Sequence, residues 1–106
     1  MNNKLNADII LELQERWERA DKNTIMDNVE HYICAIYPEC ALKWSAKIHM
    51  VSELTDSKTD AVYAWFNRGR ENVKIPFLKL CKLATSLNVD IENFLIHKGA
   101  KDNENN

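Results

Sequence analysis

Apolar side chains recur at intervals of three and four residues along most of this 106-residue chain, which is the spacing of one helix face. Only two glycines and two prolines interrupt the pattern. Because these residues punctuate helices and build tight turns, their scarcity favours long helices over many short strands. The sequence therefore predicts one all-α domain of about five to six helices.

The first helix is predicted over Leu5 to Ala20, with charged residues on the side opposite its apolar stripe. An apolar stripe of this size must be covered, either by the rest of the chain or by a second copy in a homodimer. Residues 1–22 are accordingly assigned as an N-terminal dimerisation or packing element. The residues of its stripe are Ile9, Ile10, Leu13 and Trp17.

A second helix is predicted over Thr24 to Tyr37, because Pro38 pushes the residue before it away from helical angles. The next segment, Leu42 to Met50, alternates apolar and polar residues with the period of a strand. No second segment of similar quality offers a partner strand, and a lone strand is not stable. We therefore expect a helix there.

A short helix of about ten residues is predicted to start at Ser57, which with Asp60 resembles a capping box. Gly69 is expected to end it in the left-handed conformation. A further helix begins after Ile75-Pro76, and the last one covers Ile91 to Ile96. Residues 98–106 are expected to form a disordered polar tail.

This order of helix, tight turn, short helix, polar loop and Pro-initiated helix resembles the helix-turn-helix domain of the Cro and lambda-repressor type. The resemblance covers roughly half the chain, on the scale of one small domain. It implies a helix-turn-helix domain over residues 23–97, preceded by an extra helix. The turn at Thr55 to Lys58 departs from the family pattern because it lacks the usual glycine. The segments that carry the resemblance are Met50 to Leu54, Val62 to Arg70, Ile75-Pro76 and Leu80 to Ile91.

The resemblance further implies that Ser57 to Asn67 is a recognition helix that enters the major groove of double-stranded DNA. Side chains on its outward face would then contact base edges, and basic neighbours would contact phosphates. The expected base contacts are Thr59, Asp60, Tyr63 and Asn67. The expected phosphate contacts are Lys58, Arg68, Arg70 and Lys74.

The charge distribution supports the same region independently of the family. The whole chain has a formal net charge of -2 and is no polycation. Between Lys58 and Lys82, however, six basic residues face two acidic ones, a local balance of +4. Residues 1–45 hold five basic and eight acidic residues, a balance of -3. Such an asymmetry would let one face approach phosphate while the rest is repelled.

Other classes of protein find little support. The sequence contains no nucleophile elbow, glycine-rich phosphate loop or HExxH motif, so we expect no enzyme and no cofactor. His31, Cys34 and Cys40 lie within ten residues but form no CxxC pair, so no metal site is expected. The number of cysteines is three, an odd number, so the sequence does not suggest a set of paired disulfides. No apolar run approaches the length of a membrane span. A cytoplasmic protein without membrane contact is expected.

The favoured function is a sequence-specific DNA-binding regulator, a repressor of the type carried by phages or mobile elements, acting as a homodimer. Two alternatives stay open. The overall acidity and Asp60 also suit a protein-interaction module of the same fold, an inhibitor or antirepressor that binds a protein partner. A DNA-binding accessory protein for plasmid transfer or partition cannot be separated from a repressor by sequence.

Overall fold

Every regular element in the described part of the chain is a helix. The computed structural model describes residues 2–97, with side chains described from Ala7 onward. No strand occurs among these residues, so the all-α prediction is confirmed. The predicted tail, 98–106, lies outside the described residues. The helices are α1 (Asn2–Arg19), α2 (Lys22–Ile36), α3 (Glu39–Leu42), α4 (Trp44–Thr55), α5 (Thr59–Phe66), α6 (Phe77–Leu87) and α7 (Glu92–Leu95).

The helix boundaries near Pro38 explain why the described residues contain one helix more than predicted. α2 ends before Tyr37, as Pro38 requires, but Pro38 itself has helical angles and starts the four-residue α3. Lys43 is then extended, with φ -135°, and separates α3 from α4. The alternating pattern of residues 42–50 therefore spans the end of one helix and the start of the next.

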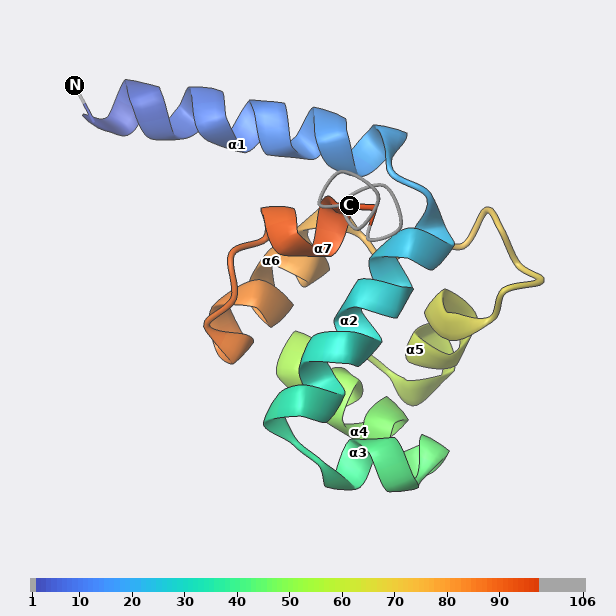
Figure 1. Cartoon of the computed structure of the whole chain (residues 1–106). Helices are drawn as coiled ribbons and strands as arrows, with labels where there is room; N and C mark the ends of the chain where they lie inside the picture. The colour runs from blue at the N-terminus through green and yellow to red at the C-terminus, as the bar shows by residue number, and fades with distance from the viewer. Residues whose placement is uncertain (1, 98–106) are drawn as a thin grey trace, which may run out of the picture.

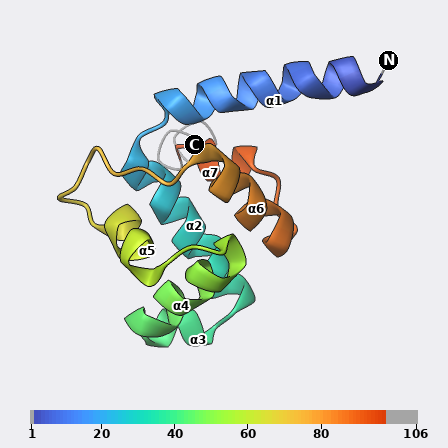
Figure 2. The same cartoon turned by 180° about the vertical axis from the view of Figure 1, so that it is seen from behind.

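α2 lies at the centre of the helical body, as Figures 1 and 2 show from opposite sides. Its apolar stripe, Ile25, Val29 and Ile33, is wholly buried. The other helices of the body turn their own stripes toward it, so that one continuous core forms. The buried side chains that meet there include Ile48, Val51, Val62, Trp65, Leu80, Leu83 and Phe94.

Among the described side chains of α1, those that anchor it to this body lie in its C-terminal half. The indole Nε1 of Trp17 donates to the carbonyl oxygen of Ile75 at 2.9 Å, and its ring lies 6.1 Å from that of Phe77. Arg16 forms an ion pair with Glu92 at 3.3 Å. The N-terminal half projects past α6 and α7 (Figures 1 and 2). Trp17 thus packs on its own chain, whereas the stripe upstream of it extends beyond the core.

A buried side-chain amide links the C-terminal helix α7 to the central helix α2. Asn28 on α2 is 3% exposed, and its Nδ2 donates to the carbonyl oxygens of Phe94 at 2.9 Å and Ile96 at 2.8 Å. These carbonyls are at the C-terminus of α7, where no further helical turn donates N–H groups to them. Asn28 therefore stabilises a helix too short to be stable alone.

Replacing Asn28 by Ala should lower the free energy of unfolding by about 1–3 kcal/mol, because the two carbonyls lose a buried donor. Urea denaturation monitored by circular dichroism measures this difference. Asn72→Ala is the matched control, since Asn72 is exposed and its loss should cost less than about 0.5 kcal/mol. Equal stability of the two variants would show that the Asn28 bonds contribute nothing net.

Candidate nucleic-acid interface

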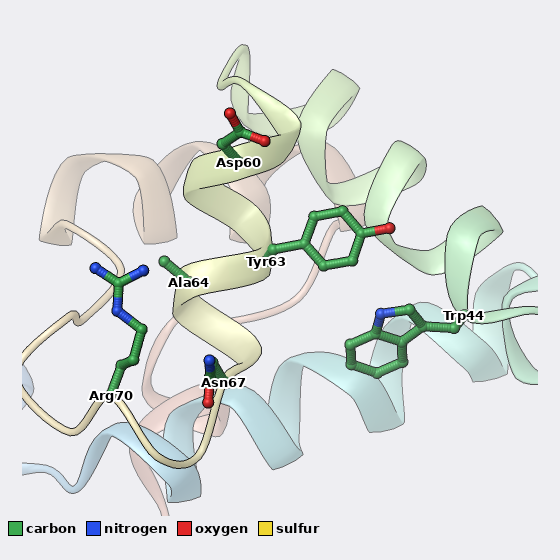
Figure 3. A pocket seen from close by; sticks show the side chains of 6 residues that line it. All are labelled: Trp44, Asp60, Tyr63, Ala64, Asn67 and Arg70. Atoms are coloured by element: carbon green, nitrogen blue, oxygen red, sulfur yellow. The ribbon is translucent and has the colours of Figure 1, made fainter.

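α5 buries one face and presents the other to solvent. Val62 and Trp65 are buried in the core, as their spacing predicts. Asp60 is exposed and Tyr63 is 45% exposed, while Thr59 is partly buried at the start of the helix. Figure 3 shows Asp60 and Tyr63 projecting from this outer face. The structure therefore gathers on one surface the side chains for which the sequence predicts base contacts.

The turn between α4 and α5 has three residues and needs no glycine. Asp56 takes the left-handed conformation, with φ 54°. The N–H of Ser57 donates to the carbonyl oxygen of Ser52 at 3.0 Å, and that of Asp56 to Glu53 at 3.3 Å. These are the two bonds of a Schellman helix end. A short polar side chain such as Asp tolerates the left-handed conformation, so the motif forms without glycine.

A lysine from another helix secures this turn. The Nζ of Lys79, on α6, donates to the carbonyl oxygens of Thr55 at 2.9 Å and Asp56 at 3.1 Å. A positive charge at a helix C-terminus also opposes the negative end of the helix dipole. Lys79 therefore helps to fix the angle at which α5 leaves α4.

The predicted capping box at the start of α5 is wrong. The helix begins at Thr59 rather than Ser57, and no side chain caps its first turn. Ser57 belongs to the turn that ends α4, and its hydroxyl donates to the carbonyl oxygen of Thr55 at 3.3 Å. Because the hydroxyl faces α4, it does not accept from the N–H groups of α5.

The predicted end of α5 is also wrong in one respect. The helix ends at Phe66, and Gly69 has no positive φ. Instead, the side-chain Oδ1 of Asn67 accepts a hydrogen bond from the N–H of Gly69 at 2.9 Å. A Cβ on residue 69 would lie 3.3 Å from that oxygen. Glycine is thus favoured here by a close approach of the Asn67 amide and not by left-handed geometry.

The chain after α5 is fixed by the ammonium group of Lys22 and not by a left-handed glycine. Lys22 is the first residue of α2 and is 5% exposed. Its Nζ donates to the carbonyl oxygens of Ala64 at 2.8 Å, Asn67 at 2.7 Å and Arg70 at 2.5 Å. Three donors and three acceptors are therefore matched in one buried cluster.

The surroundings of Lys22 also change its titration. Burial lowers the pKa of its ammonium below the ordinary value, the positive charge of Arg70 lowers it further, and Glu71 acts in the opposite direction. The buried cluster joins α2, the end of α5 and the loop after it. The position of the loop residues Asn67 and Arg70 consequently depends on a lysine more than forty residues earlier in the sequence.

Beside α5, the first turn of α4 presents an aromatic side chain that sequence reasoning did not select. Trp44 is 49% exposed and meets Phe66 edge-on, with ring centroids 5.5 Å apart. The ammonium of Lys47 lies 3.9 Å from the centroid of Trp44, a cation–π geometry, and 2.7 Å from the Oε2 of Glu30. The sequence did not predict that Trp44 lies beside α5, because the alternating pattern of residues 42–50 carries no information about contacts with α5.

These elements enclose a shallow groove along the outer face of α5. It has a volume of about 560 Å³. Figure 3 shows Trp44 and Arg70 on opposite sides of α5, with Tyr63 directed toward the Trp44 side. Hydroxyl, carboxylate, amide and guanidinium groups are all present, so the groove can both donate and accept hydrogen bonds. Its lining residues are Trp44, Asp60, Tyr63, Ala64, Asn67 and Arg70.

The four residues predicted to contact phosphate have different environments. Lys58 and Arg70 are exposed at the two ends of α5. Arg68 is exposed and forms an ion pair with Asp27 on α2. Lys74 is directed elsewhere: its Nζ donates to the carbonyl oxygens of Trp17 and Glu18 at the end of α1 and lies 4.7 Å from the Trp17 ring. Burial lowers its pKa. Lys74 therefore anchors α1.

The cysteines, histidines and carboxylates of the described residues are dispersed over the fold. Among the described residues, no three His, Cys, Asp or Glu side chains come together in a way that could hold a metal ion. Burial raises the pKa of the Cys40 and Cys81 thiols, which favours their protonated form. Within residues 2–97 no helix combines the length and the apolar character needed to cross a bilayer.

Neither a family model, nor a curated protein, nor a solved structure matches the chain. The resemblance to the Cro and lambda-repressor type stays a prediction based on the residues of this sequence.

Replacing Lys22 by Met should lower the free energy of unfolding by about 2–3 kcal/mol, because three carbonyls lose a charged donor. Urea denaturation measures the change. Lys43→Met serves as the control, since Lys43 is exposed and its substitution should alter stability by less than about 0.5 kcal/mol. A loss below about 1 kcal/mol for Lys22→Met would mean that water or a shifted loop replaces the ammonium.

Proposed function

We propose that this protein is a sequence-specific double-stranded DNA-binding regulator that acts by occupying its site on DNA. The observation that carries the proposal is the placement of α5. It follows α4 after a three-residue turn and shows an exposed polar face. Lys79 binds the carbonyls of the turn before it, and Lys22 binds a carbonyl at its C-terminal end. A short helix presented in this way fits the major groove.

The side chains of that face supply complementary chemistry for reading bases. The Thr59 hydroxyl donates or accepts at a base edge, and the Asp60 carboxylate accepts from the amino group of cytosine. The Tyr63 ring contacts a thymine methyl group, while its hydroxyl reaches a base or a phosphate. Since the Oδ1 of Asn67 already accepts from Gly69, its Nδ2 is the group that faces DNA, as a donor.

Basic side chains at the two ends of α5 set its register on the phosphate backbone. Lys58 lies at the N-terminal end and Arg70 at the C-terminal end, beside the groove. Arg68 contributes when its exposed ion pair with Asp27 exchanges for phosphate, because an exposed pair is worth little in water. Lys74 and Lys79 are not counted among these contacts, since their ammonium groups bind backbone carbonyls.

A second candidate function is favoured by one observation. The α5 groove combines the exposed aromatic rings of Trp44 and Tyr63 with the carboxylate of Asp60. Aromatic side chains are enriched at protein interfaces, and a carboxylate is repelled by phosphate. A protein partner with a basic, apolar segment would also fit this groove.

The deciding experiment is selection of bound sequences from a random duplex pool, followed by affinity measurements at two salt concentrations. We expect one enriched motif and an affinity that falls as salt rises. An inverted repeat with half-sites about 34 Å apart would show two copies bound, and a single half-site would show one. No enrichment and no duplex binding at low salt would contradict DNA binding and favour the protein partner.

Site variants test the individual roles. Arg70→Ala should weaken binding to every duplex and reduce the salt slope by about one unit, whereas Thr59→Ala and Tyr63→Phe should change the preferred sequence. Arg19→Ala is the matched control, because Arg19 is exposed on α1 and is not part of the lining of the α5 groove. A loss with Arg19→Ala equal to that with Arg70→Ala would place the DNA on another face.

A further inference from the structure

A second groove lies under the projecting half of α1, on a different part of the molecule from α5. It consists of two adjoining hollows of about 430 and 280 Å³, which share Leu13, Asp90 and Ile91. One wall is α1, and the other is the end of α6 with the turn into α7. The apolar part of the lining is Ile9, Ile10, Leu13, Ala84, Val89 and Ile91.

The α1 wall is an apolar surface without a partner in the described chain. Ile9 is 49% exposed and Ile10 is 53% exposed, although both continue the stripe that packs at Trp17. A helix stabilised by packing along one half only is marginal along the other half. Covering this stripe would therefore bury apolar surface and stabilise the projecting turns.

The charges around the groove are predominantly acidic. Asp90 and Glu92 belong to its lining, and Glu12, three residues after Ile9, lies beside the apolar stripe on α1. The cation beside them, Arg16, is already paired with Glu92 at 3.3 Å. An occupant with positive charge beside its apolar side chains would meet favourable electrostatics, whereas nucleic acid would be repelled.

We propose that this groove binds an amphipathic helix of a protein partner, with an apolar stripe flanked by Lys or Arg. Two hollows that share one wall suit apolar side chains one helical turn apart, which is how helices dock into grooves. A second copy of α1 fits less well, because beside its stripe it would add Glu12 and an Arg16 that is already paired with Glu92. The basic partner instead neutralises the groove's own carboxylates.

This surface is separate from the proposed DNA contact. In both Figure 1 and Figure 2 the N-terminal half of α1 projects away from α5. A bound partner would therefore leave the α5 face accessible. The proposal does not depend on the function of α5, and the two can fail independently.

The test selects helical peptides with randomised sequence against the full chain, then measures the affinity of the enriched peptides by fluorescence anisotropy. We expect enriched peptides with apolar residues at intervals of three and four and with net positive charge. Ile10→Asn should weaken binding tenfold or more, and Asp90→Asn about threefold to fivefold. The amide resonances of Ala84, Val89 and Ile91 should shift when the peptide binds.

Leu11→Asn is the matched control for Ile10→Asn. Leu11 is 60% exposed, and the helical period places it on the opposite side of α1 from Ile10's stripe, so binding should change less than twofold. No enrichment, enrichment of neutral or acidic peptides, or equal losses with Leu11→Asn and Ile10→Asn would overturn the proposal. Sedimentation showing self-association that Ile10→Asn abolishes would overturn it in favour of a second copy.

Discussion

The arrangement of the candidate interface depends on one buried ammonium group. Lys22 begins the central helix and binds three carbonyl oxygens at the end of α5 and in the following loop. A buried charge without partners would be prohibitively unfavourable, so the loop must keep its carbonyls directed inward. This requirement determines where the chain leaves α5 and on which side of that helix Arg70 emerges. The central helix thereby positions the exposed face of α5.

Side-chain donors bind carbonyl oxygens at helix ends elsewhere in the helical body as well. Lys79 binds the carbonyls at the end of α4, Lys74 binds those at the end of α1, and Asn28 does so at the end of α7. Each donor binds carbonyls at a helix C-terminus, where the helix itself supplies no further N–H groups. Cations used in this way are not available to phosphate. Counting charges along the sequence therefore overstates the basic character of the α5 surface.

The remaining exposed charge is distributed over two separate surfaces of the molecule. Exposed basic side chains, Lys58, Arg68 and Arg70, accompany the polar face of α5, whereas carboxylates accompany the apolar stripe of α1. If both proposals hold, these opposite charges would let the protein attract two different partners without competition between them. The anchored half of α1 connects the surfaces through Trp17, whose indole is bound to the loop before α6. This contact makes the α1 groove part of the same folded unit.

The local sequence determined the helices, their apolar faces and several of their ends. Stripes such as Ile25, Val29 and Ile33 predict burial because helical period alone brings them together, and Pro38 ends α2 through steric restriction of its neighbour. The outward side of α5 was predictable for the same reason. The tertiary structure decided what depends on distant partners: the role of Lys22, the use of Lys74 to anchor α1, and the position of Trp44 beside α5. Hydrogen bonds between residues more than forty positions apart leave no periodic signal, so only the folded chain reveals them.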